Sequence, residues 1–190
     1  ASGEAGCVSD LMERMALSHP EIAFKFISNR DTKLHTSGNC NLKDIIYTVY
    51  GREITANLIP VSVTGEAFSV EGFIGKPVIA RSNRNFENYY INGRYIKSNI
   101  ISKAIEEAYR PFMMQHKYPF TMLHFKIEPE FLDVNVHPTK MEIRFRNGRE
   151  IYELVVDTVK EAILQKDLVQ DVLRETPKKK EQPKTKEVKK

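Results

Sequence analysis

Apolar positions along the chain change their spacing several times, and each spacing predicts an element. Near the start, apolar residues recur at helical intervals (Val8, Leu11, Met12, Met15, Ala16). This spacing predicts a helix with one buried face, and His19-Pro20 is expected to end it. From 21 to 28 the sequence alternates with period two, which predicts a strand, and 33–36 is expected to return as its partner.

The rest of the chain predicts further helices and strands in alternation. Residues 42–50 are expected to form a short helix ended by Gly51, and 58–65 and 68–74 to form strands. Asn92-Gly93 is a preferred hairpin turn. Ser98 can cap a helix whose buried face is Ile101, Ala104, Ile105, Ala108 and Phe112. Strands over 121–128 and 132–136 and a helix from about Arg149 complete an α+β fold with a mixed β-sheet and helices on one side.

Composition limits the domain organisation and the compartment. Residues 1–5 are expected to be a junction, 6–175 one folded domain, and 176–190 the start of a disordered linker, because that stretch is almost entirely polar. Cys7 and Cys40 make no disulfide framework and too few ligands for a cysteine zinc site, which favours a reducing cytoplasm. No apolar run is long enough for a membrane span, and the N-terminus does not resemble a secretory signal.

Positive charge is concentrated in two places. The tail from Pro177 holds seven lysines and two glutamates, so the remaining body has a net charge of −1. Within that body, residues 76–103 carry six basic residues against Glu87 alone (Lys76, Arg81, Arg84, Arg94, Lys97, Lys103). Such charges commonly protect exposed strand edges from aggregation. The alternative is a surface that contacts the phosphate backbone of a nucleic acid.

Motifs of common enzyme classes are missing from the chain. It contains no GxSxG, HExxH, GxxxxGK[ST] or GxGxxG pattern. Its five histidines show no ligand spacing. We therefore expect the chain alone not to be a complete enzyme.

The stretch DVNVHPTKMEIRF, from Asp133 to Phe145, alternates like two strands around an interruption at His137-Pro138-Thr139-Lys140. Proline restricts its own φ and the residue before it, so the chain must turn or bulge there. Lys140 is then either a solvated loop residue or an ammonium group held toward an anion by a stiff turn. The residues themselves leave both interpretations open.

FENYYINGRYIKS and FLDVNVHPTKMEIRF together closely resemble the second domain of the DNA mismatch repair protein MutL family. ALSHPEIAFKFISN, GKPVIARSNR and PFTMLHFKIEP extend the resemblance over residues from about Glu4 to Lys166. These proteins are GHKL ATPases, whose first domain holds the nucleotide. The resemblance implies that this chain is the second, transducer domain, with a fold like the second domain of a small-subunit ribosomal protein and a left-handed β-α-β crossover.

The resemblance also implies a role for the lysine at the turn. In the family, the lysine matching Lys140 reaches the γ-phosphate of ATP in the first domain, and His137, Pro138 and Thr139 would form its stiff support. ATP and Mg²⁺ would be bound mostly by that first domain, whose catalytic motifs are not in this sequence. The fragment itself is expected to be a non-catalytic monomer without a cofactor.

Partners and location follow from the same resemblance. We expect weak DNA backbone binding through Arg81, Arg84, Arg94, Lys97 and Lys103, contact with the parent's ATPase domain, and the mismatch-recognition protein MutS as a partner. The parent is expected to be a homodimer in the bacterial cytoplasm, with no membrane contact. Some relatives have arginine where this chain has Asn99, which moves the expected DNA contact toward Arg94 and Lys97.

Two other classes stay open. The transducer domain of a type II topoisomerase uses a glutamine-threonine-lysine loop, and the loop of this chain lacks the glutamine. An RNA-binding ribosomal-type module is disfavoured because the body of the chain is close to neutral.

Overall fold

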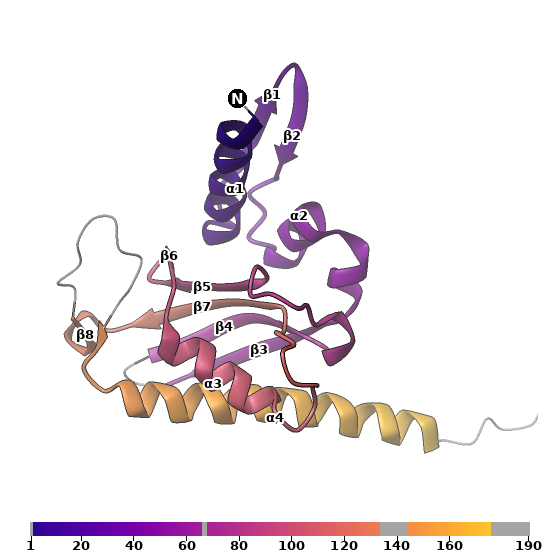
Figure 1. The fold of residues 1–190 in the computed structure, drawn as a ribbon, viewed down its shortest axis with the longest axis vertical. Coiled ribbons are helices and arrows are strands. Elements are labelled where there is room, and N and C mark those ends of the chain that lie inside the picture. Colours follow the sequence, from indigo (N-terminus) through magenta and orange to yellow (C-terminus); the bar gives the residue numbers. More distant parts are fainter. Residues whose placement is uncertain (1, 66–67, 134–143, 176–190) are drawn as a thin grey trace, which may run out of the picture.

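A mixed sheet lies between two groups of helices in the computed structural model, which describes residues 2–65, 68–133 and 144–175 (Figure 1). The helices are α1 (Ser2–Ser18), α2 (Leu42–Ala56), α3 (Asn99–Tyr109) and α4 (Gly148–Glu175), with short 3₁₀ turns at Pro77–Ile79 and Pro129–Phe131. The strands are β1 (Lys25–Ser28), β2 (Asp31–His35), β3 (Leu58–Thr64), β4 (Phe68–Gly75), β5 (Glu87–Ile91), β6 (Arg94–Ile96), β7 (Thr121–Ile127), β8 (Leu132–Asp133) and β9 (Arg144–Phe145).

The central sheet has five strands in the order β3-β4-β7-β5-β6. All neighbouring pairs are antiparallel except β5 and β7, which run parallel. Parallel neighbours need a crossover connection, and here it contains β6 and α3. The predicted α+β class with a mixed sheet is confirmed.

Helices α3 and α4 cover one face of the sheet, as Figure 1 shows below the strands. The Ser98 hydroxyl caps α3 by accepting the backbone N–H of Ile101. Four residues of the predicted face are fully buried against alternate residues of the strands, among them Leu123 and Phe125 of β7 (Ile101, Ala104, Ile105, Ala108). The fifth, Phe112, lies beyond the end of α3 and is only partly buried. In α4, the residues at the same helical spacing are buried in this core as well (Ile151, Val155, Val159, Ile163).

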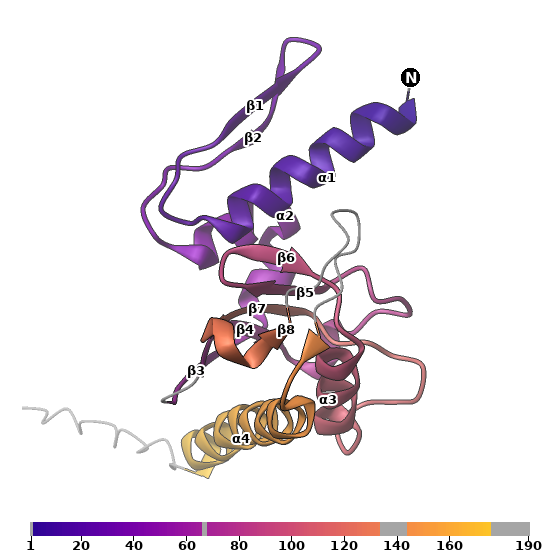
Figure 2. The same cartoon turned by 90° about the vertical axis from the view of Figure 1, so that its left-hand side faces the viewer.

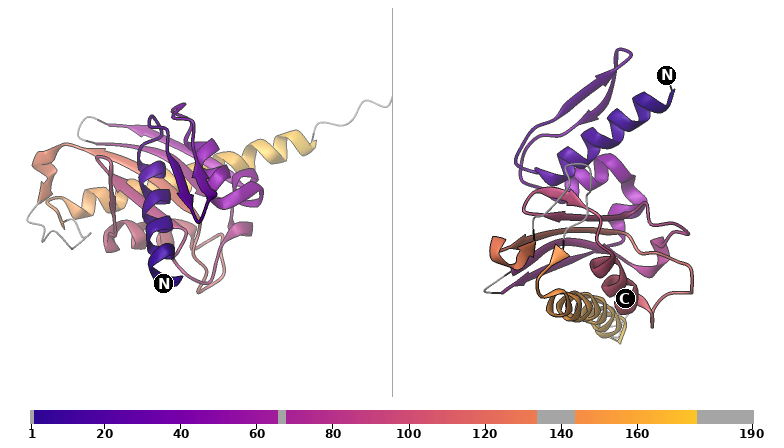
Figure 3. Two further views of the ribbon diagram at one scale, coloured as in Figure 1. Left: turned by 90° about the horizontal axis from the view of Figure 1, so that it is seen from above. Right: turned by 60° about the vertical axis from the view of Figure 1, so that its left-hand side comes forward.

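The opposite face of the sheet is also covered by helices. Leu17 of α1 and Ile46 of α2 belong to a second core with Tyr90 and Met122, whose side chains point away from α3 and α4. Figures 2 and 3 show α1, α2 and the β1–β2 hairpin on this side. The expectation of helices on one side was wrong because the odd and even residues of β5 and β7 are both apolar enough to bury two faces.

Two local expectations also differ from the structure. On α1, Ala16 is buried, but Val8, Leu11 and Met15 are 46%, 55% and 43% exposed, so most of the predicted buried face has no cover in the described residues. Helix α2 does not end at Gly51: the chain kinks there, with φ 80° and ψ −178°, and continues to Ala56. A positive φ costs glycine little, so a kink replaces the predicted stop.

The β1–β2 hairpin is shorter than its alternating pattern predicted. Strand β1 begins at Lys25 and not at residue 21. The predicted strand 132–136 is seen only as β8, because residues 134–143 lie outside the described residues. Among the described helices, none has the length and apolar character to cross a membrane.

Candidate nucleic-acid interface

The β5–β6 hairpin holds the first of the predicted DNA-binding residues. Its turn has positive φ at both central residues, 48° at Asn92 and 79° at Gly93, as a tight two-residue hairpin requires. The Asn92 amide donates to the Ile127 carbonyl at 2.9 Å, and its carbonyl oxygen accepts the Ile127 N–H at 3.0 Å. These bonds hold the turn against the end of β7, so Arg94 projects from a fixed backbone.

Arg94 and Lys97 are both exposed, at the start and just beyond the end of β6. Strand β6 is an outer strand of the sheet. Neither side chain forms an ion pair within 2–65, 68–133 and 144–175. Both charges are thus free of acidic partners among the described residues, and their contact with a phosphate backbone stays a prediction.

The two arginines before β5 are engaged within the molecule. Arg84 donates to the Glu106 carboxylate at 2.5 Å, and its guanidinium lies 4.7 Å from the centre of the Tyr118 ring. Arg81 lies 3.9 Å from Glu53 and 5.5 Å from the ring centre of its near neighbour Phe86. Both side chains remain partly exposed, but neither is an isolated cation.

Helix α3 brings Lys103 near the Arg84 site. Lys103 is exposed and lies one turn before Glu106 on the helix, so the two residues share a face. Glu107, the next residue, pairs with Arg110. The predicted basic residues are therefore not all alike: Arg94 lies at the hairpin turn, whereas Arg84 pairs with Glu106, a glutamate one helical turn from Lys103.

A buried carboxyl group, Glu87, lies at the start of β5 close to this cluster. It is 7% exposed, accepts the Tyr89 hydroxyl at 3.1 Å, and has one oxygen without a partner among the described residues. Burial raises the pKa of Glu87 from 4.5 to about 7, and the Tyr89 hydrogen bond opposes that rise. The sequence shows Glu87 only as a charge, although its spacing of two from Tyr89 places both side chains on the face of β5 that α3 and α4 cover.

His137, Pro138, Thr139 and Lys140 lie outside the described residues. The strands that flank them are β8 and β9, which pair antiparallel with Leu132 opposite Phe145 and Asp133 opposite Arg144. This pairing agrees with the predicted pair of strands around an interruption. The position of the Lys140 ammonium group stays a prediction.

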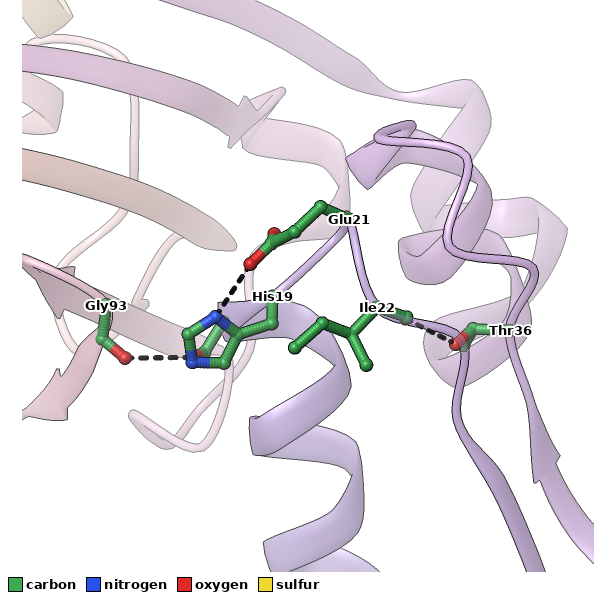
Figure 4. Close-up of polar contacts among 6 residues, drawn as sticks. His19, Glu21, Ile22, Thr36 and Gly93 are labelled. Carbon is green, nitrogen blue, oxygen red and sulfur yellow. Dashed lines mark hydrogen bonds and ion pairs between the residues drawn. The ribbon is translucent and has the colours of Figure 1, made fainter.

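The N-terminal unit (α1, β1 and β2) meets the sheet at the same hairpin. The Ser18 hydroxyl donates to the Gly93 carbonyl at 2.8 Å. The ring of the neighbouring His19 contacts the Glu21 carboxylate at 2.9 Å (Figure 4). Arg14 lies 4.5 Å from the centre of the Tyr95 ring on β6. The last turn of α1 is therefore attached to the turn that precedes Arg94.

His124 of β7 lies half-buried near this contact, with its Nε2 atom shielded from solvent. Its ring stacks on Tyr90 with centroids 4.7 Å apart. Burial lowers the pKa of His124 to about 4, while a hydrogen bond to the Leu17 backbone partly opposes the shift. The histidine is thus a neutral packing residue of the junction between α1 and the sheet, and not a free acid or base at neutral pH.

Metal-binding groups are not gathered in the described ranges. Residues 2–65, 68–133 and 144–175 contain no cluster of three or more histidine, cysteine or acidic side chains that could hold an ion. Cys7 and Cys40 are exposed free thiols.

Comparison with known proteins agrees with the architecture. Residues 46–164 match the family model described as DNA mismatch repair protein, C-terminal domain. A DNA mismatch repair protein MutL from Agathobacter rectalis is 60% identical over 172 residues, which cover 90% of this chain and 26% of that protein. MutL from Clostridium acetobutylicum is 43% identical over 160 residues, 84% of this chain and 26% of its own length.

Two solved structures have the same fold. One, described as the N-terminal domain of a DNA repair protein, has a TM-score of 0.71 at 20% identity and covers 87% of this chain and 54% of its own. The Aquifex aeolicus MutL ATPase domain complexed with ADP has a TM-score of 0.54 at 16% identity, over 83% of this chain and 48% of its own.

The mixed-sheet α+β fold of this chain is shared with these two solved structures. The match of residues 46–164 covers more than half of the chain. The chain belongs to the MutL family of DNA mismatch repair proteins. It spans about a quarter of the length of the curated relatives it matches.

Proposed function

We propose that this chain is the transducer domain of a MutL-type mismatch repair ATPase, which couples the nucleotide state of a preceding GHKL ATPase domain to DNA binding. Family membership supports the mismatch repair context. The chain itself performs no catalysis in this proposal. ATP and Mg²⁺ are held mostly by the preceding domain, in a bacterial cytoplasmic protein.

The observation that carries the proposal is the exposed stripe of α1, formed by Val8, Leu11 and Met15. Apolar side chains at this spacing normally face a partner, and exposed apolar patches often mark interaction sites. Ile22, before the β1–β2 hairpin, and Ile27, in β1, are also about half exposed. We assign this surface to contact with the ATPase domain.

The route from that surface to the DNA-binding residues is short. Ser18, at the end of α1, donates to the Gly93 carbonyl, and Arg94 follows Gly93 directly. A movement of α1 against the sheet would therefore act on the hairpin that carries Arg94. This connection supports coupling between the two surfaces through packed, hydrogen-bonded elements.

Lys140 is the proposed sensor of the nucleotide. Its role rests on the HPTK motif, in which the family lysine contacts the γ-phosphate of ATP. An ammonium group beside the triphosphate would favour one arrangement of the two domains and so report nucleotide binding. MutS binding and a homodimeric parent belong to the same proposal.

The experiment is Lys140→Ala in the full-length parent protein, assayed for ATP hydrolysis and thermal unfolding. We expect hydrolysis to fall while the melting temperature is nearly unchanged, because surface substitutions usually alter the free energy of unfolding by within about 0.5 kcal/mol. Unaltered hydrolysis, or a loss of several kcal/mol in stability, would contradict the proposed role of Lys140.

The topoisomerase alternative is disfavoured. The family assignment and the missing glutamine in the HPTK loop both favour mismatch repair. No observation in the described residues favours an RNA-binding module.

A further inference from the structure

One glutamate interrupts the basic surface that we assign to DNA. The Glu106 carboxylate of α3 accepts a hydrogen bond from Arg84 at 2.5 Å. On the same face of the helix, one turn earlier, Lys103 is exposed. The carboxylate therefore pairs with one of the five cations predicted to contact phosphates and lies one helical turn from another.

Arg84 is positioned by more than its ion pair. Its guanidinium lies over the Tyr118 ring at 4.7 Å. Tyr118 is in turn fixed by two backbone hydrogen bonds to Arg81, of 2.8 and 2.9 Å. Removing the Glu106 charge should thus leave the arginine stacked in place, ready for another anion.

The ion pair is open to exchange with solvent anions. The side chains of Arg84 and Glu106 are 53% and 32% exposed. Exposed pairs of this kind contribute only about 0.2–1 kcal/mol, because water competes for both charges. A phosphate group can therefore replace the carboxylate without leaving a buried charge unpaired.

We propose that Glu106 takes the place of a DNA phosphate at Arg84 and thereby lowers the affinity of this domain for duplex DNA. While the pair is intact, the charge of Arg84 is balanced internally and neutralises no phosphate. DNA binding at this position requires displacement of the carboxylate, whose charge then repels the bound backbone. The inference rests on the proposed DNA-binding role of the basic segment.

The test is Glu106→Gln in the complete chain, with duplex DNA affinity measured by fluorescence anisotropy over a series of salt concentrations. Glutamine keeps the size and the acceptor oxygen but removes the charge. We expect affinity to rise about 1.4- to fivefold, which corresponds to the free energy of an exposed ion pair. The slope of log affinity against log salt should steepen by about 0.9, since one more phosphate is neutralised.

The matched control is Glu153→Gln. Glu153 pairs with Arg149 at 2.8 Å on α4, so this variant makes the same change of charge at another exposed ion pair. It should raise affinity less than Glu106→Gln does. Adding Arg84→Gln to Glu106→Gln should remove the gain, and melting curves would show that every variant is folded.

The outcomes separate this inference from the proposed function. If the wild-type chain binds DNA but Glu106→Gln behaves like Glu153→Gln, or keeps its gain without Arg84, the role assigned to Glu106 is wrong and the DNA-binding function stands. If the folded wild-type chain binds no duplex DNA at low salt, both are wrong.

Discussion

At the scale of single residues, the cations of the basic segment differ in what surrounds them. Arg94 and Lys97 are exposed and unpaired among the described residues, whereas Arg84 is held by Glu106 and Tyr118. A free cation releases counterions when it binds a phosphate, and a paired one does so only after its partner leaves. Arg94 is therefore expected to contribute most clearly to DNA binding.

Replacing Arg94 by glutamate should weaken binding of this chain to duplex DNA without unfolding it. The slope of log affinity against log salt should become shallower by about 0.9 for the lost phosphate contact. Lys43→Glu, at an exposed position at the start of α2, makes the same charge reversal as a control. The polar tail is common to all variants, so its own lysines cancel in the comparison. An Arg94 variant that binds like the Lys43 variant would contradict the assignment.

Glu87 should make stability depend on pH. Its pKa rises from 4.5 to about 7 on folding, so the folded protein holds this proton more tightly than the unfolded chain. The carboxyl therefore costs stability as pH rises from about 4.5 to about 7, and the full cost persists above that. Glu87→Gln should raise the free energy of unfolding at pH 8 by about 1–3 kcal/mol relative to wild type, with little gain at pH 4.

Urea unfolding at both pH values checks this expectation, with the exposed Glu128→Gln as control. His124 has the opposite effect on the pH dependence of stability. Its pKa falls to about 4 on folding, so the unfolded chain binds a proton more readily and stability falls as pH drops from about 6.5 to about 4. Because the two effects overlap between pH 4.5 and 6.5, only the difference between variant and wild type isolates Glu87. An equal gain in the free energy of unfolding at pH 4 and pH 8 would mean that ionisation of Glu87 does not lower stability.

At the scale of elements, sequence patterns predicted α3 well and α1 poorly. Both helices carry apolar residues at helical spacing, but only the face of α3 is buried within the chain. An apolar stripe indicates that a partner exists, and it carries no information on where that partner lies. The Arg84–Glu106 pair could not be predicted from the sequence either, because it joins residues 22 positions apart that only the packing of α3 brings together.

The two sides of α1 should respond differently to substitution. Leu17 is 1% exposed in the junction core, whereas Leu11 is 55% exposed on the stripe. Leu17→Ala should cost about 2–5 kcal/mol of unfolding free energy. Leu11→Ala should change the free energy of unfolding by no more than about 0.5 kcal/mol. Thermal or urea unfolding of the two variants checks this, and a large loss with Leu11→Ala would mean that its side is buried within this chain.

At the scale of the whole molecule, the sheet separates two surfaces. The helices α3 and α4 cover one face, and the N-terminal unit with its exposed stripe lies on the other (Figure 2). The sequence predicted the mixed sheet and the hairpin, because their periods and turn residues are local. It did not predict that helices cover the second face of the sheet, because the side on which each helix packs against β5 and β7 is set by tertiary structure.

The β5–β6 hairpin connects the N-terminal unit to the predicted DNA-binding residues. Ser18 of α1 binds its turn, and Arg94 projects from the next residue. Coupling in the parent protein would thus need no long path through the core. It would need only that nucleotide binding alters how the ATPase domain holds α1.

The most direct test is the affinity of the full-length parent for duplex DNA with and without a non-hydrolysable ATP analogue. We expect the analogue to change DNA affinity in the wild type, and both Lys140→Ala and Leu11→Glu to reduce that change while leaving nucleotide-free DNA binding intact. If the analogue leaves wild-type DNA affinity unaltered, or if both variants respond as the wild type does, this domain does not couple nucleotide state to DNA.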